Sequence, residues 1–104
     1  METIKIENLE IMLSDLEDEY KWYDAEKECG KKGFRVPTID ELAIIFENRE
    51  KIGGFSNGFY WSSTEGEESD FRSNAFCMYM GERGGAPSEG DKDDYCCVRP
   101  VKSI

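Results

Sequence analysis

Four cysteines and a run of three hydroxyl residues are the side chains of this sequence that could act as nucleophiles. Ser62, Ser63 and Thr64 follow two aromatic residues in the stretch GFYWSSTEGEES. The cysteines are Cys29, Cys77, Cys96 and Cys97. A hydroxyl nucleophile needs a neighbouring general base, and the chain contains no histidine. A reactive cysteine needs a lowered thiol pKa, and we expect the acidic surroundings to raise that pKa instead. We therefore predict that the protein is not an enzyme.

Acidic side chains gather in the stretch SEGDKDD, and their oxygen atoms are the ligands that calcium prefers. The calcium candidates are Glu89, Asp91, Asp93 and Asp94. We favour a solvated charged loop over a calcium site for this stretch. The cysteines include no Cys-x-x-Cys pair, so a zinc site is not expected either. We predict no cofactor.

The charge balance restricts the partners. The 104 residues include 13 basic and 23 acidic side chains, a formal net charge of -10. This field repels nucleic acids and anionic membranes and favours a basic or neutral partner surface. The N-terminal stretch contains neither a signal peptide nor a membrane span. We expect a cytoplasmic protein, and an extracellular one only if a leader precedes this sequence. We expect it to be a monomer or a small homo-oligomer.

The spacing of apolar residues predicts one α+β domain over 1–104. Period-2 alternation predicts strands over 3–7 and 10–13. Trp22, Ala25 and Cys29 lie on one face of a helix that begins near residue 21. A second helix begins at Thr38, which forms a capping box with Glu41.

The second half of the chain predicts three strands, over 59–63, 75–80 and 95–101. Between them, 65–73 and 81–94 are rich in glycine, serine and acidic residues, which predicts loops. Neighbouring residues of a strand point to opposite faces, so Tyr60 and Trp61 cannot form one aromatic platform. By the same rule, one of Cys96 and Cys97 should be buried and the other turned outward.

Several motifs occur together and in order: WYDAEKECGKKGFRVPTIDEL, IGGFSNGFYWSST, AFCMYMG and CVRPV. Together they resemble the Lcl C-terminal domain family, a bacterial branch of the C-type lectin-like fold. The resemblance implies a small twisted antiparallel sheet, two flanking helices and long loops. It also implies that the N- and C-terminal strands pair and that the loops over 66–94 face the ligand.

The resemblance further implies two disulfides. One joins Cys29 to Cys96 or Cys97, and the other joins Cys77 to the remaining member of that adjacent pair. Because a cytoplasmic location is expected, we favour buried, reduced thiols over disulfides.

The family pattern also implies a set of structural residues. They are Trp22, Arg35, Pro37, Thr38, Glu41, Trp61 and Arg99. We expect the two arginines to form ion pairs with acids such as Asp24, Asp40 or Glu41. Five aromatic residues are assigned to the core: Trp22, Phe34, Phe46, Phe59 and Trp61. Phe71 is the exception, because it lies in a polar loop where an aromatic ring is a candidate contact residue.

We therefore predict a non-enzymatic binding module that presents the loops over 66–94 to a protein or a glycan, as a phage or mobile-element product. The candidate contact residues are Phe71, Arg72, Asn74, Arg83, Glu89 and Asp91. One alternative is an extracellular adhesin or surface-protein domain with disulfides. The other is a cysteine-dependent enzyme, distantly like the formylglycine-generating enzyme, that uses Cys77, Cys96 or Cys97.

Overall fold

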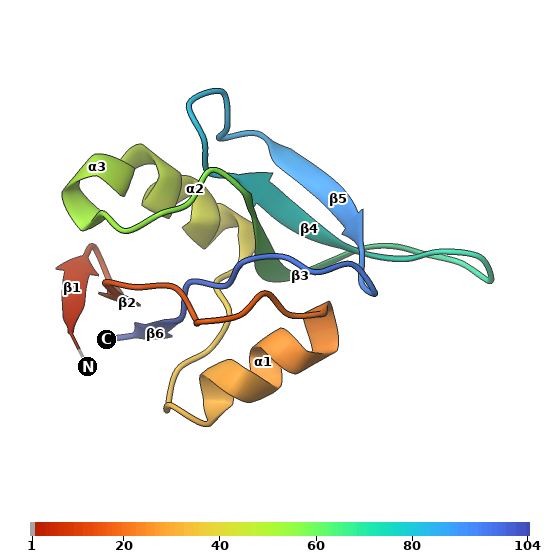
Figure 1. The fold of residues 1–104 in the computed structure, drawn as a ribbon, viewed down its shortest axis with the longest axis horizontal. Coiled ribbons are helices and arrows are strands. Elements are labelled where there is room, and N and C mark those ends of the chain that lie inside the picture. The colour runs from red at the N-terminus through yellow and green to blue at the C-terminus, as the bar shows by residue number, and fades with distance from the viewer. Residues whose placement is uncertain (1) are drawn as a thin grey trace.

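Two three-stranded antiparallel sheets and three helices make up residues 2–104, the part of the chain that the computed structural model describes (Figure 1). The first sheet has the order β1 (Thr3–Ile6), β2 (Leu9–Met12) and β6 (Val101–Ser103). The second has the order β3 (Phe59–Glu68), β4 (Ser73–Tyr79) and β5 (Pro87–Asp91). Pairing of β2 with β6 confirms that strands from the two ends of the chain meet.

The helices are α1 (Trp22–Gly30), α2 (Ile39–Glu47) and the short α3 (Arg49–Ile52). The predicted capping box of α2 is confirmed. The Thr38 hydroxyl oxygen accepts a hydrogen bond from the Glu41 N–H at 3.2 Å, and the Glu41 carboxylate accepts one from the Thr38 N–H at 2.9 Å. In Figure 1, α1 lies along the opposite side of the molecule from α2 and α3. No helix within the described residues has the length and apolar character needed to cross a membrane.

Strand β3 separates two hydrophobic clusters, because consecutive side chains point to opposite faces. Tyr60 packs in the cluster of the first sheet and α2, which includes Leu42 and Val101. Trp61 packs in the cluster of α1, which includes Cys29. Both rings are fully buried, which confirms that they do not form one exposed platform. Strand β3 is therefore packed on both faces, and it holds the residues of the candidate site in place.

Three predictions about the second half of the chain were wrong. Strand β3 continues to Glu68, so the predicted 65–73 loop shortens to the turn over 69–72. The predicted 81–94 loop contains β5, an edge strand that begins at Pro87, where a missing N–H costs nothing. Of the predicted 95–101 strand, only Val101 lies in β6, since the preceding residues make isolated bridges such as Tyr60 with Cys97. The described residues are α+β, as predicted, with one more sheet and one more short helix than the resemblance implies.

Candidate binding face

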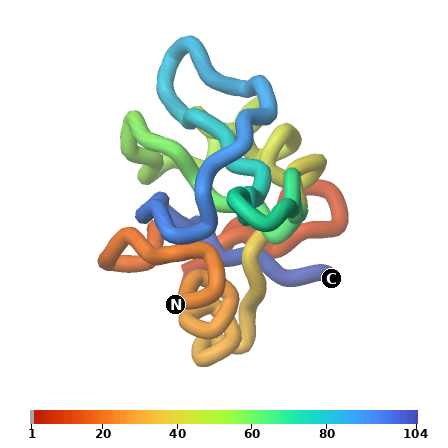
Figure 2. Tube along the Cα trace, turned by 90° about the vertical axis from the view of Figure 1, so that its right-hand side faces the viewer, coloured from red at the N-terminus to blue at the C-terminus, as the bar shows by residue number. Residues whose placement is uncertain are grey.

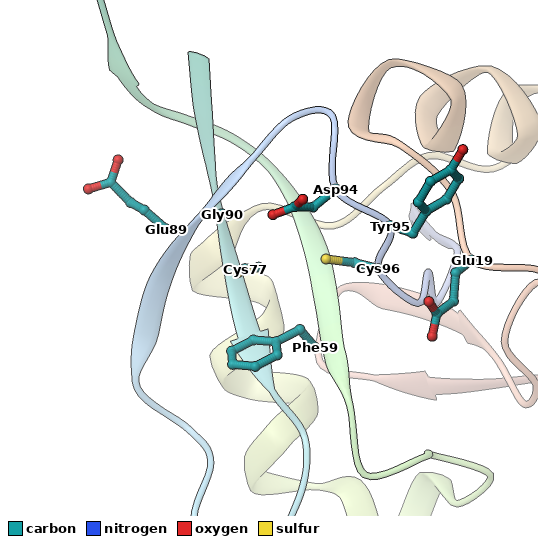
Figure 3. A pocket seen from close by; sticks show the side chains of 8 residues that line it. All are labelled: Glu19, Phe59, Cys77, Glu89, Gly90, Asp94, Tyr95 and Cys96. Carbon is teal, nitrogen blue, oxygen red and sulfur yellow. The ribbon is translucent and has the colours of Figure 1, made fainter. Parts of the chain in front are cut away.

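A cavity of about 490 Å³ opens beside the second sheet, next to the chain that leads from β5 to β6 (Figure 3). We call it the acidic pocket. Its sheet side is formed by Phe59, Cys77, Glu89 and Gly90, and its other side by Glu19, Asp94, Tyr95 and Cys96. In Figure 3, the Cys96 thiol and the Asp94 carboxylate point toward the sheet, and Glu89 lies on the outer side of β5.

Backbone pairing fixes the wall that faces the sheet. Tyr20 exchanges backbone hydrogen bonds with Cys96, at 3.0 and 3.1 Å. The neighbouring Cys97 donates its N–H to the Phe59 carbonyl and accepts from the Trp61 N–H. The segment that carries Asp94, Tyr95 and Cys96 is therefore held between the start of α1 and β3. The pocket is a preformed feature of the fold.

The pocket is negatively charged. Its lining residues include Glu19, Glu89 and Asp94 and no lysine or arginine, with the Glu89 carboxylate on the outer side of β5. Five ion pairs occur within residues 2–104, and none of them uses these three residues. The Glu89 carboxylate accepts a hydrogen bond from the Glu67 N–H at 2.7 Å, which leaves its charge in place.

Two thiols form the buried end of the pocket. Cys77 and Cys96 are both buried and belong to the same hydrophobic cluster. Hydrogen bonding between the two side chains lowers the pKa of Cys77 and raises that of Cys96, because one shared proton stabilises a single thiolate. Burial raises the pKa of Cys29 to about 12, and burial also raises that of Cys97. The acidic neighbour Asp94 raises the pKa of Cys77, as expected, but the effect of Cys96 is larger and lowers the pKa overall.

All four cysteines are free thiols in the structure. Cys29, Cys77 and Cys96 belong to the α1 cluster, whereas Cys97 packs against the other cluster. The prediction that Cys96 and Cys97 face opposite sides therefore agrees with the structure. Cys97 is half-buried, and its sulfur lies 3.3 Å from the Ser56 hydroxyl.

The turn over 69–72 forms the tip of the β3–β4 hairpin, which extends beyond the rest of the second sheet (Figure 1). We call this turn the hairpin tip. The Ser69 hydroxyl oxygen accepts hydrogen bonds from the Phe71 and Arg72 N–H groups, at 3.3 and 3.1 Å. The Ser69 N–H donates to the Arg72 carbonyl at 2.8 Å. This closed turn leaves the Phe71 ring 97% exposed.

Lys92 anchors the part of this hairpin next to the tip, a role that its sequence surroundings do not predict. Its amine lies 3.3 Å from a carboxylate oxygen of Glu65 and also bonds the carboxylate of Glu68. The same amine lies 4.2 Å from the centre of the Trp22 ring, on α1. Lys92 is only 3% exposed although it lies in the acid-rich stretch that predicted a solvated loop. Its position as a single lysine between acidic residues is the feature of the sequence that could have indicated this role.

The six candidate contact residues do not form one surface. Phe71 and Arg72 lie at the hairpin tip, and Asn74 pairs with Asp91 just behind it. Glu89 lies farther along β5, at the acidic pocket. Arg83 lies in the β4–β5 connection, beyond the other end of β4. Figure 2 shows this connection at the top of the molecule, well away from the hairpin.

The four calcium candidates are also not brought together. The Asp91 carboxylate accepts a hydrogen bond from the Asp93 N–H at 2.8 Å, which closes a local turn. Glu89 bonds β3, and Asp94 faces the acidic pocket. Within residues 2–104, no three histidine, cysteine or acidic side chains are placed to hold a metal ion.

The predicted structural residues near α2 and α1 make the expected kinds of contact. The Arg35 guanidinium binds both carboxylate oxygens of Glu41, at 2.7 and 2.9 Å, as predicted. The carbonyl of the buried Pro37 accepts a hydrogen bond from the Ser63 N–H at 2.8 Å. The Trp22 indole N–H donates to a β3 carbonyl, so this half-buried ring joins α1 to the sheet.

Arg99 is fully buried and forms an ion pair, but with a partner that was not predicted. Its Nε donates to Asp15 at 2.9 Å, and its other nitrogens donate to the carbonyls of Met12, Gly53 and Gly54. Assigning Phe59 to the core was also wrong. Phe59 is the first residue of β3, and its ring is 45% exposed against Tyr79 at the mouth of the pocket.

Comparison with known proteins identifies the fold. The chain matches no protein-family model and no curated protein sequence, so the resemblance to the Lcl C-terminal domain family stays a prediction. Among solved structures it is similar to EMS16, a snake venom C-type lectin-like protein and an antagonist of the collagen receptor integrin alpha2beta1. The TM-score is 0.73 at 14% sequence identity, over 98% of this chain and 97% of EMS16. The chain therefore has the C-type lectin-like fold, as predicted.

Proposed function

We propose that the protein is a non-enzymatic binding module that holds a protein partner with its hairpin tip and acidic pocket. The observation that carries this proposal is the exposed Phe71 ring at the hairpin tip. Burying such a ring against a partner contributes about 1.5–3 kcal/mol. Arg72 lies beside it, and aromatic residues and arginine are enriched at protein interfaces. This composition favours a protein partner over a glycan.

The hairpin is ordered before it binds. The hydrogen bonds of Ser69 close the tip. Lys92 joins the adjoining part of β3 to Trp22 of α1. A preformed contact surface loses less conformational entropy on association than a flexible loop does. The net charge of -10 favours a partner whose contact surface is basic.

The fold of EMS16 supports a binding role, because that protein acts as an antagonist of a receptor. The thiols of Cys77 and Cys96 do not give similar support to a catalytic role. Both thiols are buried, and the chain has no histidine to move their protons. We also propose a cytoplasmic location, where free thiols such as the four of this structure persist.

A capture experiment with matched variants tests the proposal. The wild type, Phe71→Ala and Arg83→Ala are immobilised and exposed to a lysate of the source cell. Retained proteins are quantified with and without soluble wild-type protein as competitor. Both replaced side chains are exposed, but Arg83 lies beyond the far end of β4. We expect Phe71→Ala to lose competed proteins that Arg83→Ala keeps. Equal capture by all three forms would exclude the hairpin tip as the contact.

A further inference from the structure

We propose that the acidic pocket receives the guanidinium group of an arginine side chain from the partner. This inference rests on the proposed function as a binding module and gives the chemistry of the partner at one site. It is carried by three features of the pocket: its shape, its unpaired carboxylates and its exposed aromatic rings.

A charged ligand in the pocket would lie next to weakly polar, buried side chains. The lining of the cavity of about 490 Å³ includes Cys77 and Cys96, which are both buried. Thiols of this kind behave as small hydrophobic groups. Because the surrounding protein is less polarisable than water, a charge that enters the pocket interacts more strongly with the carboxylates at its mouth.

The carboxylates lack cationic partners. Glu19 comes from the segment before α1 and Asp94 from the segment after β5, so two separate parts of the chain converge on the opening. Within residues 2–104 neither one takes part in an ion pair, and the Asp94 carboxylate accepts no hydrogen bond. A ligand with a positive charge would supply the missing partner.

Aromatic rings flank the same opening. Phe59 is 45% exposed and Tyr95 is 62% exposed, and both line the pocket. The amine of Lys21 lies 5.8 Å from the centre of the Tyr95 ring, so this ring already attracts one cation of the chain. Lys21 does not line the pocket, which leaves Phe59 as the aromatic face for the ligand.

An arginine of the chain itself, Arg99, contacts an aromatic ring and a carboxylate together. The Arg99 guanidinium lies 3.9 Å from the centre of the Phe55 ring while its Nε donates to Asp15. The Arg49 guanidinium lies at the same distance from the Phe46 ring. A guanidinium is planar and weakly hydrated, so it stacks on a ring and binds a carboxylate through two parallel hydrogen bonds. An ammonium group can lie over a ring and bind carboxylates, as that of Lys92 does, but it offers neither planar stacking nor two parallel hydrogen bonds. We therefore assign the pocket to arginine.

A titration followed by NMR tests this inference with a defined probe. The probe is N-acetyl-arginine amide, and its neutral analogue is N-acetyl-citrulline amide. We expect the arginine probe to shift the backbone amide signals of Gly90, Tyr95 and Cys96 in a saturable way at low salt. The citrulline probe, which matches the shape without the charge, should leave them in place. Equal shifts with both probes, or no shift with either, would overturn the inference.

Variants localise the effect. Glu19→Gln/Asp94→Asn removes two charges at the pocket, and Glu82→Gln/Glu50→Gln removes two exposed charges elsewhere. We expect the first pair to weaken binding of the arginine probe about fivefold or more, and the second to change it less than about twofold. Equal weakening by both pairs would mean that only the net charge matters, which would overturn the assignment to the pocket.

The two proposals fail separately. If Phe71→Ala loses captured proteins but the arginine probe does not bind, the arginine inference is wrong and the binding module stands. If the probe binds the pocket but Phe71→Ala captures as the wild type does, the pocket assignment stands and the hairpin tip is excluded as the contact.

Discussion

The amine of Lys92 lies 4.2 Å from the centre of the Trp22 ring, with the carboxylates of Glu65 and Glu68 on the same amine. Glu65 and Glu68 belong to β3, Lys92 follows β5, and Trp22 begins α1. One ammonium group therefore joins the hairpin, the edge strand and the helix. It supports both parts of the binding face, since the pocket wall begins two residues later at Asp94.

Replacing Lys92 with methionine should loosen the hairpin. Methionine keeps the packing on Trp22 but loses the charge that binds the ring and the two carboxylates. We expect the free energy of unfolding in urea to fall by about 1–3 kcal/mol, with faster hydrogen exchange in the hairpin. The control is Lys51→Met, an exposed position on α3, which should cost less than about 0.5 kcal/mol. Equal losses for the two variants would contradict the role assigned to Lys92.

Replacing Arg99 with methionine should cost much more, because it leaves Asp15 without its cation and three backbone carbonyls without donors. We expect a loss of about 3–5 kcal/mol in the free energy of unfolding. Arg99→Lys should also destabilise, since a lysine cannot reproduce four hydrogen bonds with a planar geometry. Arg83→Met, at an exposed site, provides the comparison. A loss below about 1 kcal/mol for Arg99→Met would show that the buried network is dispensable.

The Arg35–Glu41 pair predicts a pH dependence of stability. The hydrogen bonds from Arg35, helped by those of Thr38, hold the pKa of Glu41 below its ordinary value. Because the folded pKa is lowered, the pair contributes stability above the unfolded pKa of about 4.3 and loses it as the pH falls through the folded pKa. Glutamine at position 41 keeps the capping box but not the charge.

We therefore expect Glu41→Gln to lower the free energy of unfolding by about 1–2 kcal/mol near pH 7. The difference from the wild type should shrink toward zero as the pH falls below about 4. Urea unfolding of both proteins across this range measures it. A difference that stays constant down to about pH 3 would contradict the ion pair as its source.

The thiols separate the cytoplasmic proposal from the disulfide-bonded alternative. In protein purified without reductant and then unfolded, we expect four titratable thiols, whereas two disulfides would leave none. In the folded protein, iodoacetamide should modify Cys29 at least about tenfold more slowly than Cys97. Cys29 is fully buried with a pKa of about 12, and Cys97 is only half-buried. Mass spectrometry of the labelled peptides gives both rates, and similar rates would contradict the packing of Cys29.

Features within one short segment could be predicted from the sequence. The capping box joins residues three positions apart, the Arg35–Glu41 pair joins residues six positions apart, and the opposite faces of Tyr60 and Trp61 follow from strand geometry. Long-range packing could not be predicted in this way. Asp15 meets Arg99 across 84 residues, and only the folded chain brings Lys92 to Trp22.

For the candidate site, too, local features could be predicted from the sequence and long-range ones could not. Phe71 was predicted as a contact residue because an aromatic ring in a polar turn is conspicuous, and it is 97% exposed. The acidic pocket was missed because Glu19, Phe59 and Asp94 come from three distant segments. Strand β5 was missed because its residues are typical of loops, and its pairing with β4 is a property of the sheet.

The most direct test of the binding module is the amount of each competed protein that Phe71→Ala recovers relative to Arg83→Ala in the capture experiment. Our account predicts that Arg83→Ala recovers as much as the wild type and that Phe71→Ala recovers at least about tenfold less, as expected when a central aromatic contact is removed. Recovery by Phe71→Ala at the level of Arg83→Ala would contradict the account.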